Sequence, residues 1–175
     1  HALTSADIGG MSYRKAKMDL VEFLQQESLK LASYLRGSKL KLHVDIAKQP
    51  IWIYADETRL CQLLENLIAN CVKYAADGSQ VSIIAHKAGK EKCVTLRIED
   101  DGQGVEERHL PHLFEHLYRV DSSRNRKTGG TGLGLSICSH IVAAHNGQIS
   151  AERSTFGGLA IIIKFPLIEN WEKYE

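Results

Sequence analysis

The sequence has no long hydrophobic run, little proline and no excess of charge of one sign. Its apolar stretches fall short of the roughly 18 residues that a membrane-spanning helix needs, and its start lacks the basic and apolar segments of a secretion signal. Lys and Arg number 22 against 21 Asp and Glu, so the net charge of +1 provides no field to hold a nucleic-acid backbone or an anionic membrane. With 3 prolines among 175 residues, the composition is not that of a disordered or fibrous chain. We therefore expect one soluble globular domain.

The cysteines form no recognisable framework. Cys61, Cys71, Cys93 and Cys138 lie far apart and include no CxxC pair. Neither a disulfide scaffold nor a zinc site is indicated, because both have characteristic close spacings. Isolated cysteines are typical of buried thiols in a reducing compartment.

The spacing of apolar residues changes between helical and extended patterns along the chain. Helices are predicted over 19–35, 57–74 and 133–146, and strands over 40–46, 51–54, 81–85, 94–98, around Ile149 and over 159–165. Strands and helices do not alternate as they do in a doubly wound sheet. We therefore expect an α+β fold with a mixed, mostly antiparallel sheet and helices on one face.

Two segments stand outside this pattern. Residues 1–10 are small and polar and end in two glycines, as a linker does. Beyond Gly104 the periodicity fails for about 25 residues, apart from the short stretch HLPHLFEHLYRV, and irregular inserts of this length are usually functional. We interpret the insert as a lid.

The helix predicted over 57–74 has a polar face. Its apolar stripe consists of Leu60, Leu63, Leu64, Leu67 and Cys71. At about 100° per residue, Asn66, Asn70 and Lys73 cluster on the opposite side. Asn is unfavourable inside a helix, so two of them four residues apart favour a specific role. Their amide oxygens could join water and phosphate oxygens around Mg²⁺, with Lys73 on phosphate; a solvated surface is the alternative.

The segment IEDDGQGV follows a predicted strand. Asp100 at the strand end can accept a hydrogen bond from an exocyclic amine, and Gly102 and Gly104 allow the backbone to approach a flat ring. This arrangement suits adenine. An ordinary Asp-Gly turn is the alternative.

The segment GGTGLGLSI at 129–137 leads directly into a predicted helix. Backbone N–H groups at a glycine-rich helix start form an anion site, for which phosphate is a natural ligand. The segment has neither the lysine of a Walker A loop nor the preceding strand of a dinucleotide site, and a structural hinge is the alternative. Metal, adenine and phosphate sites in one chain are most simply explained by ATP.

Four motifs together resemble one family. ENLIANCVKYA, DDGQGV, LFEHLYRVD and GGTGLGLSI are similar, in order and spacing, to the N box, first glycine box, F box and second glycine box of sensor histidine kinases of two-component systems. The resemblance implies the Bergerat ATP-binding fold, a two-layer α/β sandwich with ATP between the N-box helix and the lid. It divides the chain into a linker at 1–10 from a missing His-containing dimerisation hairpin, a catalytic ATP-binding domain at 11–168 and a C-terminal tail at 169–175.

The resemblance also implies residue roles. Asn70 is the expected principal Mg²⁺ ligand with help from Asn66, and Asp100 the expected partner of the adenine amine. Lys73 and Tyr74 are expected to face the phosphates and nucleotide. Arg119 is expected to reach the γ-phosphate, so that Arg119 and Lys73 are the candidate catalytic residues. The other expected nucleotide-binding positions are Gly102, Gly104, Gly130, Thr131, Gly132, Leu133, Gly134 and Leu135.

Some positions depart from the family pattern. Asp101 replaces a usual Asn, Leu117 a usual aromatic residue and Leu159 a common Thr, although none of them removes a matched ligand. The spacing of His109, His112 and His116 could suggest a metal site, but Pro111 interrupts the turn and the F box accounts for the region. We therefore assign these histidines to the F box rather than to a metal site.

None of the histidines precedes the phosphoacceptor pattern of the family, so the acceptor is expected upstream, on a separate hairpin. The expected function is thus a protein-histidine kinase that donates the γ-phosphate of Mg-ATP to that histidine, from which it passes to an Asp of a response regulator. ATP-hydrolysing relatives place a water-activating Glu at the position of Asn66, so the Asn favours phosphate transfer over hydrolysis. The adjacent Glu65 points about 100° away on the helix and is not assigned this role.

The expected setting is the cytoplasmic portion of a homodimeric inner-membrane sensor, with this fragment monomeric and without a nucleic-acid partner. Two alternatives remain at this stage. One is a serine kinase of the anti-sigma-factor type, and the other is a non-catalytic nucleotide-sensing domain of the same fold.

Overall fold

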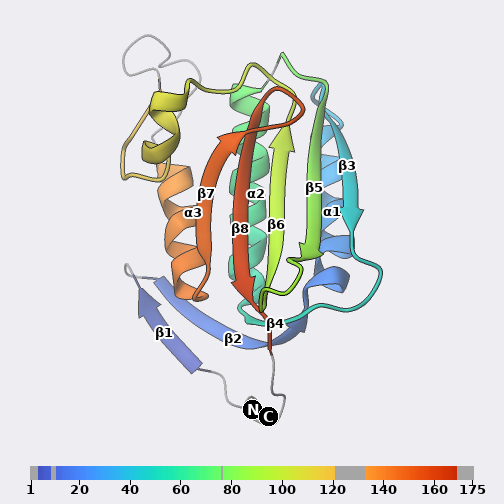
Figure 1. Cartoon of the computed structure of the whole chain (residues 1–175), viewed down its shortest axis with the longest axis vertical. Coiled ribbons are helices and arrows are strands. Elements are labelled where there is room, and N and C mark those ends of the chain that lie inside the picture. The colour runs from blue at the N-terminus through green and yellow to red at the C-terminus, as the bar shows by residue number, and fades with distance from the viewer. Residues whose placement is uncertain (1–3, 9–10, 76, 121–132, 169–175) are drawn as a thin grey trace.

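The computed structural model describes residues 4–8, 11–75, 77–120 and 133–168 (Figure 1). The strands are β1 Thr4–Ile8, β2 Met11–Asp19, β3 Lys41–Ile46, β4 Trp52–Ala55, β5 Gln80–Lys87, β6 Cys93–Asp100, β7 Gln148–Arg153 and β8 Leu159–Pro166. The helices are α1 Leu20–Leu35, α2 Glu57–Tyr74, α3 Leu133–Ala144 and the short 3-10 helix η1 Glu107–His112. None of the helices in these ranges has the length and hydropathy needed to cross a lipid bilayer.

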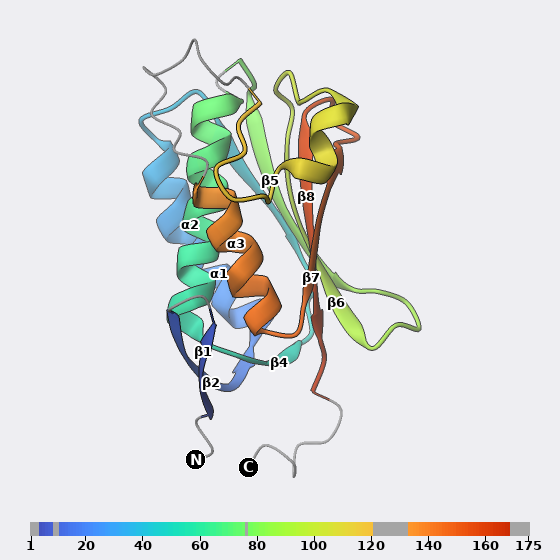
Figure 2. The same ribbon diagram turned by 90° about the vertical axis from the view of Figure 1, so that its left-hand side faces the viewer.

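The main sheet has the strand order β3-β5-β6-β8-β7. β3 pairs with β5 in parallel, and the other neighbours in this sheet are antiparallel. Figure 2 shows α1, α2 and α3 together on one side of this sheet. The predicted two-layer α+β fold with a mixed, mostly antiparallel sheet and helices on one face is confirmed.

The core lies between the sheet and the three helices. Alternate residues of β5, β6 and β8 point inward, and Ile83, Leu96 and Ile163 are almost fully buried there. From α2, Leu64 and Ile68 pack against them. Burial of one such side chain contributes roughly 1.5–3 kcal/mol, which holds α2 in a fixed place over β6.

Both long helices begin at aspartate caps. Asp19 accepts the N–H of Val21 at 2.9 Å and that of Ile51 at 3.1 Å, so it joins the start of α1 to the segment before β4. Asp56 accepts the N–H groups of Arg59 at 3.1 Å and of Arg14 on β2 at 2.6 Å. Each cap satisfies helix donors and also connects distant segments.

The sequence patterns did not predict β1 and β2. β1 lies inside the segment expected to be a linker and pairs with β2 in an antiparallel ladder, while β2 also pairs with β4. In β2 the buried positions include Tyr13 and Lys15, and the long stem of a lysine can be buried while its charge stays near water. Because charged residues interrupt the apolar alternation, the strand pattern is hidden.

His145 links the end of α3 to the start of α2. Its Nδ1 lies 2.7 Å from the carbonyl oxygen of Ile141, and the backbone N–H of Asp56 donates to its Nε2 at 3.0 Å. This pairing requires the neutral tautomer with hydrogen on Nδ1. Burial lowers the pKa of the imidazole; the bond to Ile141 and the charge of Asp56 oppose this effect, and the charge of Lys15 adds to it.

We predict that mild acid destabilises the fold through His145. Its pKa in the folded protein lies below the ordinary 6.5, so its contribution is fully present above pH 6.5 and is lost as the pH falls through the lower folded-state value. Denaturant unfolding at several pH values across this window measures the effect. His145→Gln should flatten the pH dependence, whereas His140→Gln, at an exposed position of α3, should retain it. Equal pH dependence in His145→Gln and the wild type would contradict this account.

Candidate functional site

Several segments meet at one end of the molecule. The C-terminal ends of α2 and β6, the N-terminal end of α3 and the turn between β7 and β8 all lie at the top of Figure 1, away from β1 and β4. α2 runs behind the sheet, roughly along the strands, and packs beside α3 (Figure 1). The fold therefore brings the N-box helix, the first glycine box and the start of the α3 segment to the same end.

Asp100 is the last residue of β6, and it is only 4% exposed. Its Oδ1 accepts the backbone N–H of Gly102 at 3.0 Å and that of Leu159 at 3.3 Å. Its Oδ2 lies 3.9 Å from the Sγ of Cys71 on α2. Burial raises the pKa of the Asp100 carboxyl, although the two backbone hydrogen bonds lower it. Contacts from three segments of the chain therefore hold this buried carboxylate.

Glycines make room for this carboxylate. A Cβ on Gly158 would collide with Oδ1 of Asp100, and one on Gly102 would lie 2.8 Å from the Cβ of Ala75 at the end of α2. Gly104 has a φ of 70°, and its Cβ would lie 3.2 Å from the carbonyl oxygen of Gly158. The first glycine box thus packs against both α2 and the β7–β8 turn.

The polar face of α2 is accessible. Asn66 and Asn70 are partly exposed, and Lys73 and Tyr74 are exposed. Glu65 is exposed one position before Asn66. Within the described ranges, neither carboxamide side chain has a hydrogen-bond partner, so both amide oxygens are available to a ligand.

Asp101 anchors the loop between α2 and β5. Its carboxylate accepts the backbone N–H groups of Ser79 at 2.8 Å and Gln80 at 2.9 Å, and the hydroxyl of Ser79 at 2.5 Å. Partial burial by itself raises the pKa of this carboxyl, but the hydrogen bonds outweigh it and the pKa is lowered. The residue that departs from the family pattern therefore braces the backbone next to Asp100.

The lid region is described in part. Gly130, Thr131, Gly132 and the side chain of Leu133 lie outside the described residues, while Gly134 and Leu135 are partly exposed in the first turn of α3. Among the described residues, a Cβ on Gly134 would meet no atom within 4 Å.

The F box follows η1. Arg119 is partly exposed, and Leu117 is 59% exposed with a φ of 64°, a conformation that is uncommon for a branched side chain. His109 forms a hydrogen bond with the hydroxyl of Tyr118, and His112 with the carboxylate of Glu115. These histidines therefore face partners within their own segment.

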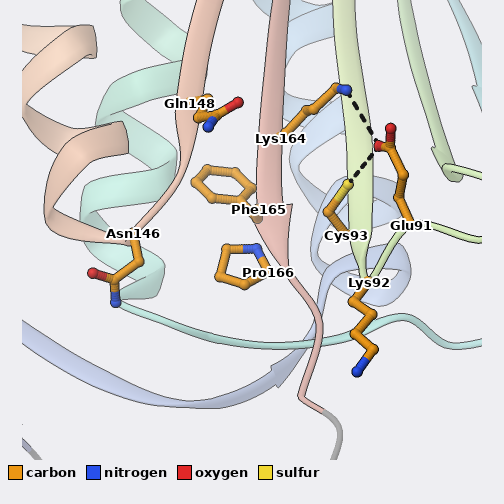
Figure 3. A pocket seen from close by; sticks show the side chains of 8 residues that line it. All are labelled: Glu91, Lys92, Cys93, Asn146, Gln148, Lys164, Phe165 and Pro166. Atoms are coloured by element: carbon orange, nitrogen blue, oxygen red, sulfur yellow. Dashed lines mark hydrogen bonds and ion pairs between the residues drawn. The ribbon is translucent and has the colours of Figure 1, made fainter.

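A groove of about 360 Å³ lies at the opposite end of the sheet (Figure 3). It is lined by Glu91, Lys92, Cys93, Asn146, Gln148, Lys164, Phe165 and Pro166. Glu91 accepts hydrogen bonds from Lys164 at 3.2 Å and from Cys93 at 3.3 Å. Lys164 and Cys93 are thus both paired with Glu91, and none of the candidate site residues lines this groove.

Comparison with known proteins decides the family. A family model described as histidine kinase-, DNA gyrase B-, and HSP90-like ATPase matches residues 55–169. The chain belongs to this family. Since the match contains α2, Asp100 and the start of α3, the candidate site lies within the family's ATP-binding domain.

The relatives of this ATPase domain are sensor kinases. It is 39% identical over 167 residues to the signal transduction histidine-protein kinase BaeS of Escherichia coli K12, covering 95% of this chain and 35% of BaeS. It is 41% identical over 118 residues to the sensor histidine kinase YkoH of Bacillus subtilis, covering 67% of this chain and 25% of YkoH. The chain thus spans about a third of BaeS and a quarter of YkoH. The resemblance to sensor histidine kinases is confirmed, and these relatives disfavour the anti-sigma-type serine kinase.

Solved structures agree on the fold of the ATPase domain. The mycobacterial sensor histidine kinase MprB superposes with a TM-score of 0.71 at 23% identity, covering 86% of this chain and 97% of that chain. Full-length ShkA in complex with AMPPNP superposes with a TM-score of 0.73 at 24% identity, covering 94% of this chain and 32% of ShkA.

Sequence reasoning missed two residues around Asp100. Gly158 leaves the space that the carboxylate occupies, and Cys71 contacts Oδ2. The signal for Gly158 was the glycine pair before the last strand. Cys71 was assigned only to the apolar stripe, because a thiol is counted as a small hydrophobic group.

We predict that Gly158→Ala weakens ATP binding by displacing Asp100. Small misplacements of recognition groups reduce binding or rate by about tenfold or more. Gly37→Ala is the matched control, because a Cβ there meets no atom within 4 Å. Calorimetry with Mg-ATP and thermal unfolding should be measured for both variants. Wild-type ATP affinity in a folded Gly158→Ala variant would contradict the described packing.

Proposed function

We propose that this domain binds Mg-ATP at the end of α2 and donates the γ-phosphate to a histidine on a separate helical hairpin. The observation that supports the proposal best is the buried Asp100 carboxylate beside an accessible polar helix face. The first supplies a base-recognition group and the second supplies ligands for a metal and for phosphates.

Adenine recognition is assigned to Asp100. Its Oδ1 already accepts two backbone N–H groups, whereas Oδ2 accepts only the weak thiol donor of Cys71 among the described contacts. Oδ2 can therefore accept a hydrogen bond from the exocyclic amine of adenine. Guanine carries an oxygen in place of that amine, and two acceptors facing each other are unfavourable.

Magnesium ligation is assigned to Asn70, with Asn66 one turn before it. The pair fits the ion, because neutral amide oxygens are hard ligands and both carboxamides are accessible and without partners among the described residues. When bound, Mg²⁺ neutralises negative charge on the phosphates. Lys73, exposed at the end of α2, and Tyr74 are assigned to the phosphate and nucleotide side of the same face.

Phosphoryl transfer needs positioning and positive charge more than a protein base. Lys73 and Arg119 are assigned the role of catalytic residues that neutralise charge at the γ-phosphate. The backbone N–H groups from Gly130 to Leu135 are assigned to the phosphates, because a glycine-rich helix start is an anion site. A neutral imidazole has a free lone pair, so the incoming histidine attacks without a base. Asn66 agrees with this, because its amide cannot act as a general base.

The remaining parts of the system are proposals of the same kind. Residues 1–10 lead from the histidine-containing dimerisation hairpin, 11–168 form the catalytic domain and 169–175 form a tail. A response regulator Asp receives the phosphate from the hairpin. The parent protein is proposed to be a homodimeric inner-membrane sensor with this domain in the cytoplasm. Support comes from the sensor kinases, of which the chain spans about a third or less.

We predict that Asn70→Ala lowers Mg²⁺-dependent ATP affinity by at least about tenfold, since even loss of a group that only supports a metal ligand commonly costs that much. Binding measured by calorimetry with Mg²⁺ and with EDTA separates the metal contribution from the rest. Gln25→Ala, which removes an exposed carboxamide from α1, should leave both values unchanged. An unchanged magnesium effect in Asn70→Ala would remove the assignment of Asn70 as a ligand.

The proposed reaction is tested by transfer of labelled phosphate. With ATP labelled at the γ-position, the domain should label a separately supplied histidine-containing hairpin of its parent protein in an acid-labile, base-stable form. A hairpin with that histidine changed to Gln should stay unlabelled. Acid-labile label on the domain itself would show that the acceptor lies in this chain. Absence of any transfer would contradict the proposed reaction and favour the non-catalytic, nucleotide-sensing alternative.

A further inference from the structure

The thiol of Cys71 is the α2 side chain that reaches the Asp100 carboxylate. Cys71 is 8% exposed, and its Sγ–H donates to Oδ2 of Asp100 at 3.9 Å. Cys71 belongs to the buried side of α2, and its thiol connects this side of the helix to Asp100. The apolar-stripe interpretation gave this residue a packing role only.

The two oxygens of Asp100 have different surroundings. Oδ1 accepts from Gly102 and Leu159, which accounts for the roughly two hydrogen bonds that a carboxylate oxygen accepts. Oδ2 accepts from the Cys71 thiol and keeps capacity for one further donor. The thiol therefore restricts the direction from which a ligand can approach Oδ2.

The chemistry of the thiol suits this role. An ordinary thiol is protonated at neutral pH, so Cys71 can donate its S–H to Oδ2 of Asp100 across the 3.9 Å contact. A thiol is a weak donor and a small group. It can hold the orientation of the carboxylate without competing strongly with the amine of a bound base.

We propose that Cys71 is a positioning residue for base selection, whose thiol orients Oδ2 of Asp100 toward the exocyclic amine of adenine. The inference rests on the proposed function, because it places adenine at Asp100. A residue with this role affects the choice of base more than the binding of phosphates or metal.

The chain provides a matched control. Cys138 on α3 is fully buried, and its thiol donates to the carbonyl oxygen of Leu63 on α2 at 3.8 Å rather than to Asp100. Removal of either thiol deletes one buried sulfur and one weak hydrogen bond. Only removal of the Cys71 thiol changes the surroundings of Oδ2.

The experiment compares ATP with purine riboside triphosphate, which lacks the exocyclic amine. Calorimetry with Mg²⁺ gives the ratio of the two affinities for the wild type, Cys71→Ala, Cys71→Val, Cys71→Ser and Cys138→Ala. Ala and Val both remove the donor, and Val keeps more of the side-chain volume, so Val serves if Ala does not fold. The ratio should fall about fivefold in these variants, the effect of one modest hydrogen bond, and stay at the wild-type value in Cys138→Ala. Cys71→Ser, which keeps a donor, should retain most of the preference.

Asp100→Asn separates the two levels of the argument. The substitution keeps an oxygen for the N–H groups of Gly102 and Leu159 and puts an amide donor in the place of Oδ2. If it removes the preference for ATP while Cys71→Ala and Cys71→Val keep it, Cys71 only packs and the inference is overturned. If Asp100→Asn keeps the preference, or the wild type has none, the assignment of adenine to Asp100 fails.

Discussion

A carboxylate buried at the end of a strand is the constraint on which this site depends. An ionised group is costly to remove from water unless hydrogen bonds replace its hydration. Asp100 obtains them from Gly102 in its own loop, Leu159 across the sheet and Cys71 on the covering helix. These contacts require α2, β6 and the start of β8 to hold fixed positions relative to one another. The same contacts leave one carboxylate oxygen able to accept from a ligand, so folding and recognition use the same interactions.

The two ends of α2 have different tasks. At its N-terminus, the carboxylate of Asp56 caps the helix and accepts from Arg14 on β2, and the backbone N–H of Asp56 donates to His145. At its C-terminus, Asn70 and Lys73 are accessible and belong to the proposed nucleotide site. The apolar stripe between them fixes the helix on the sheet. A rigidly held helix of this kind can keep a metal ligand and a base-recognition group at a constant distance, as a phosphoryl-transfer site requires.

Much of this arrangement could be predicted from the sequence, and the exceptions have physical causes. The helix over 57–74 was predicted with its observed bounds, because its caps and its apolar period are local features. β2 was missed because Lys15 is buried by its stem, and Gly158 because its contact with Asp100 joins distant parts of the chain. The family was recognised from four motifs, and the comparisons confirm it. The roles of Asn66, Asn70, Lys73 and Arg119 stay predictions, since a metal or phosphate role appears only with the ligand present.

The most direct test of the central claim is a crystal structure of the domain with Mg²⁺ and a non-hydrolysable ATP analogue. The account predicts that the adenine amine donates to Oδ2 of Asp100, that Asn70 lies in the coordination shell of the metal and that the phosphates face the start of α3. A nucleotide bound elsewhere, such as in the groove between Glu91 and Lys164, with Asp100 free of the base, would contradict it.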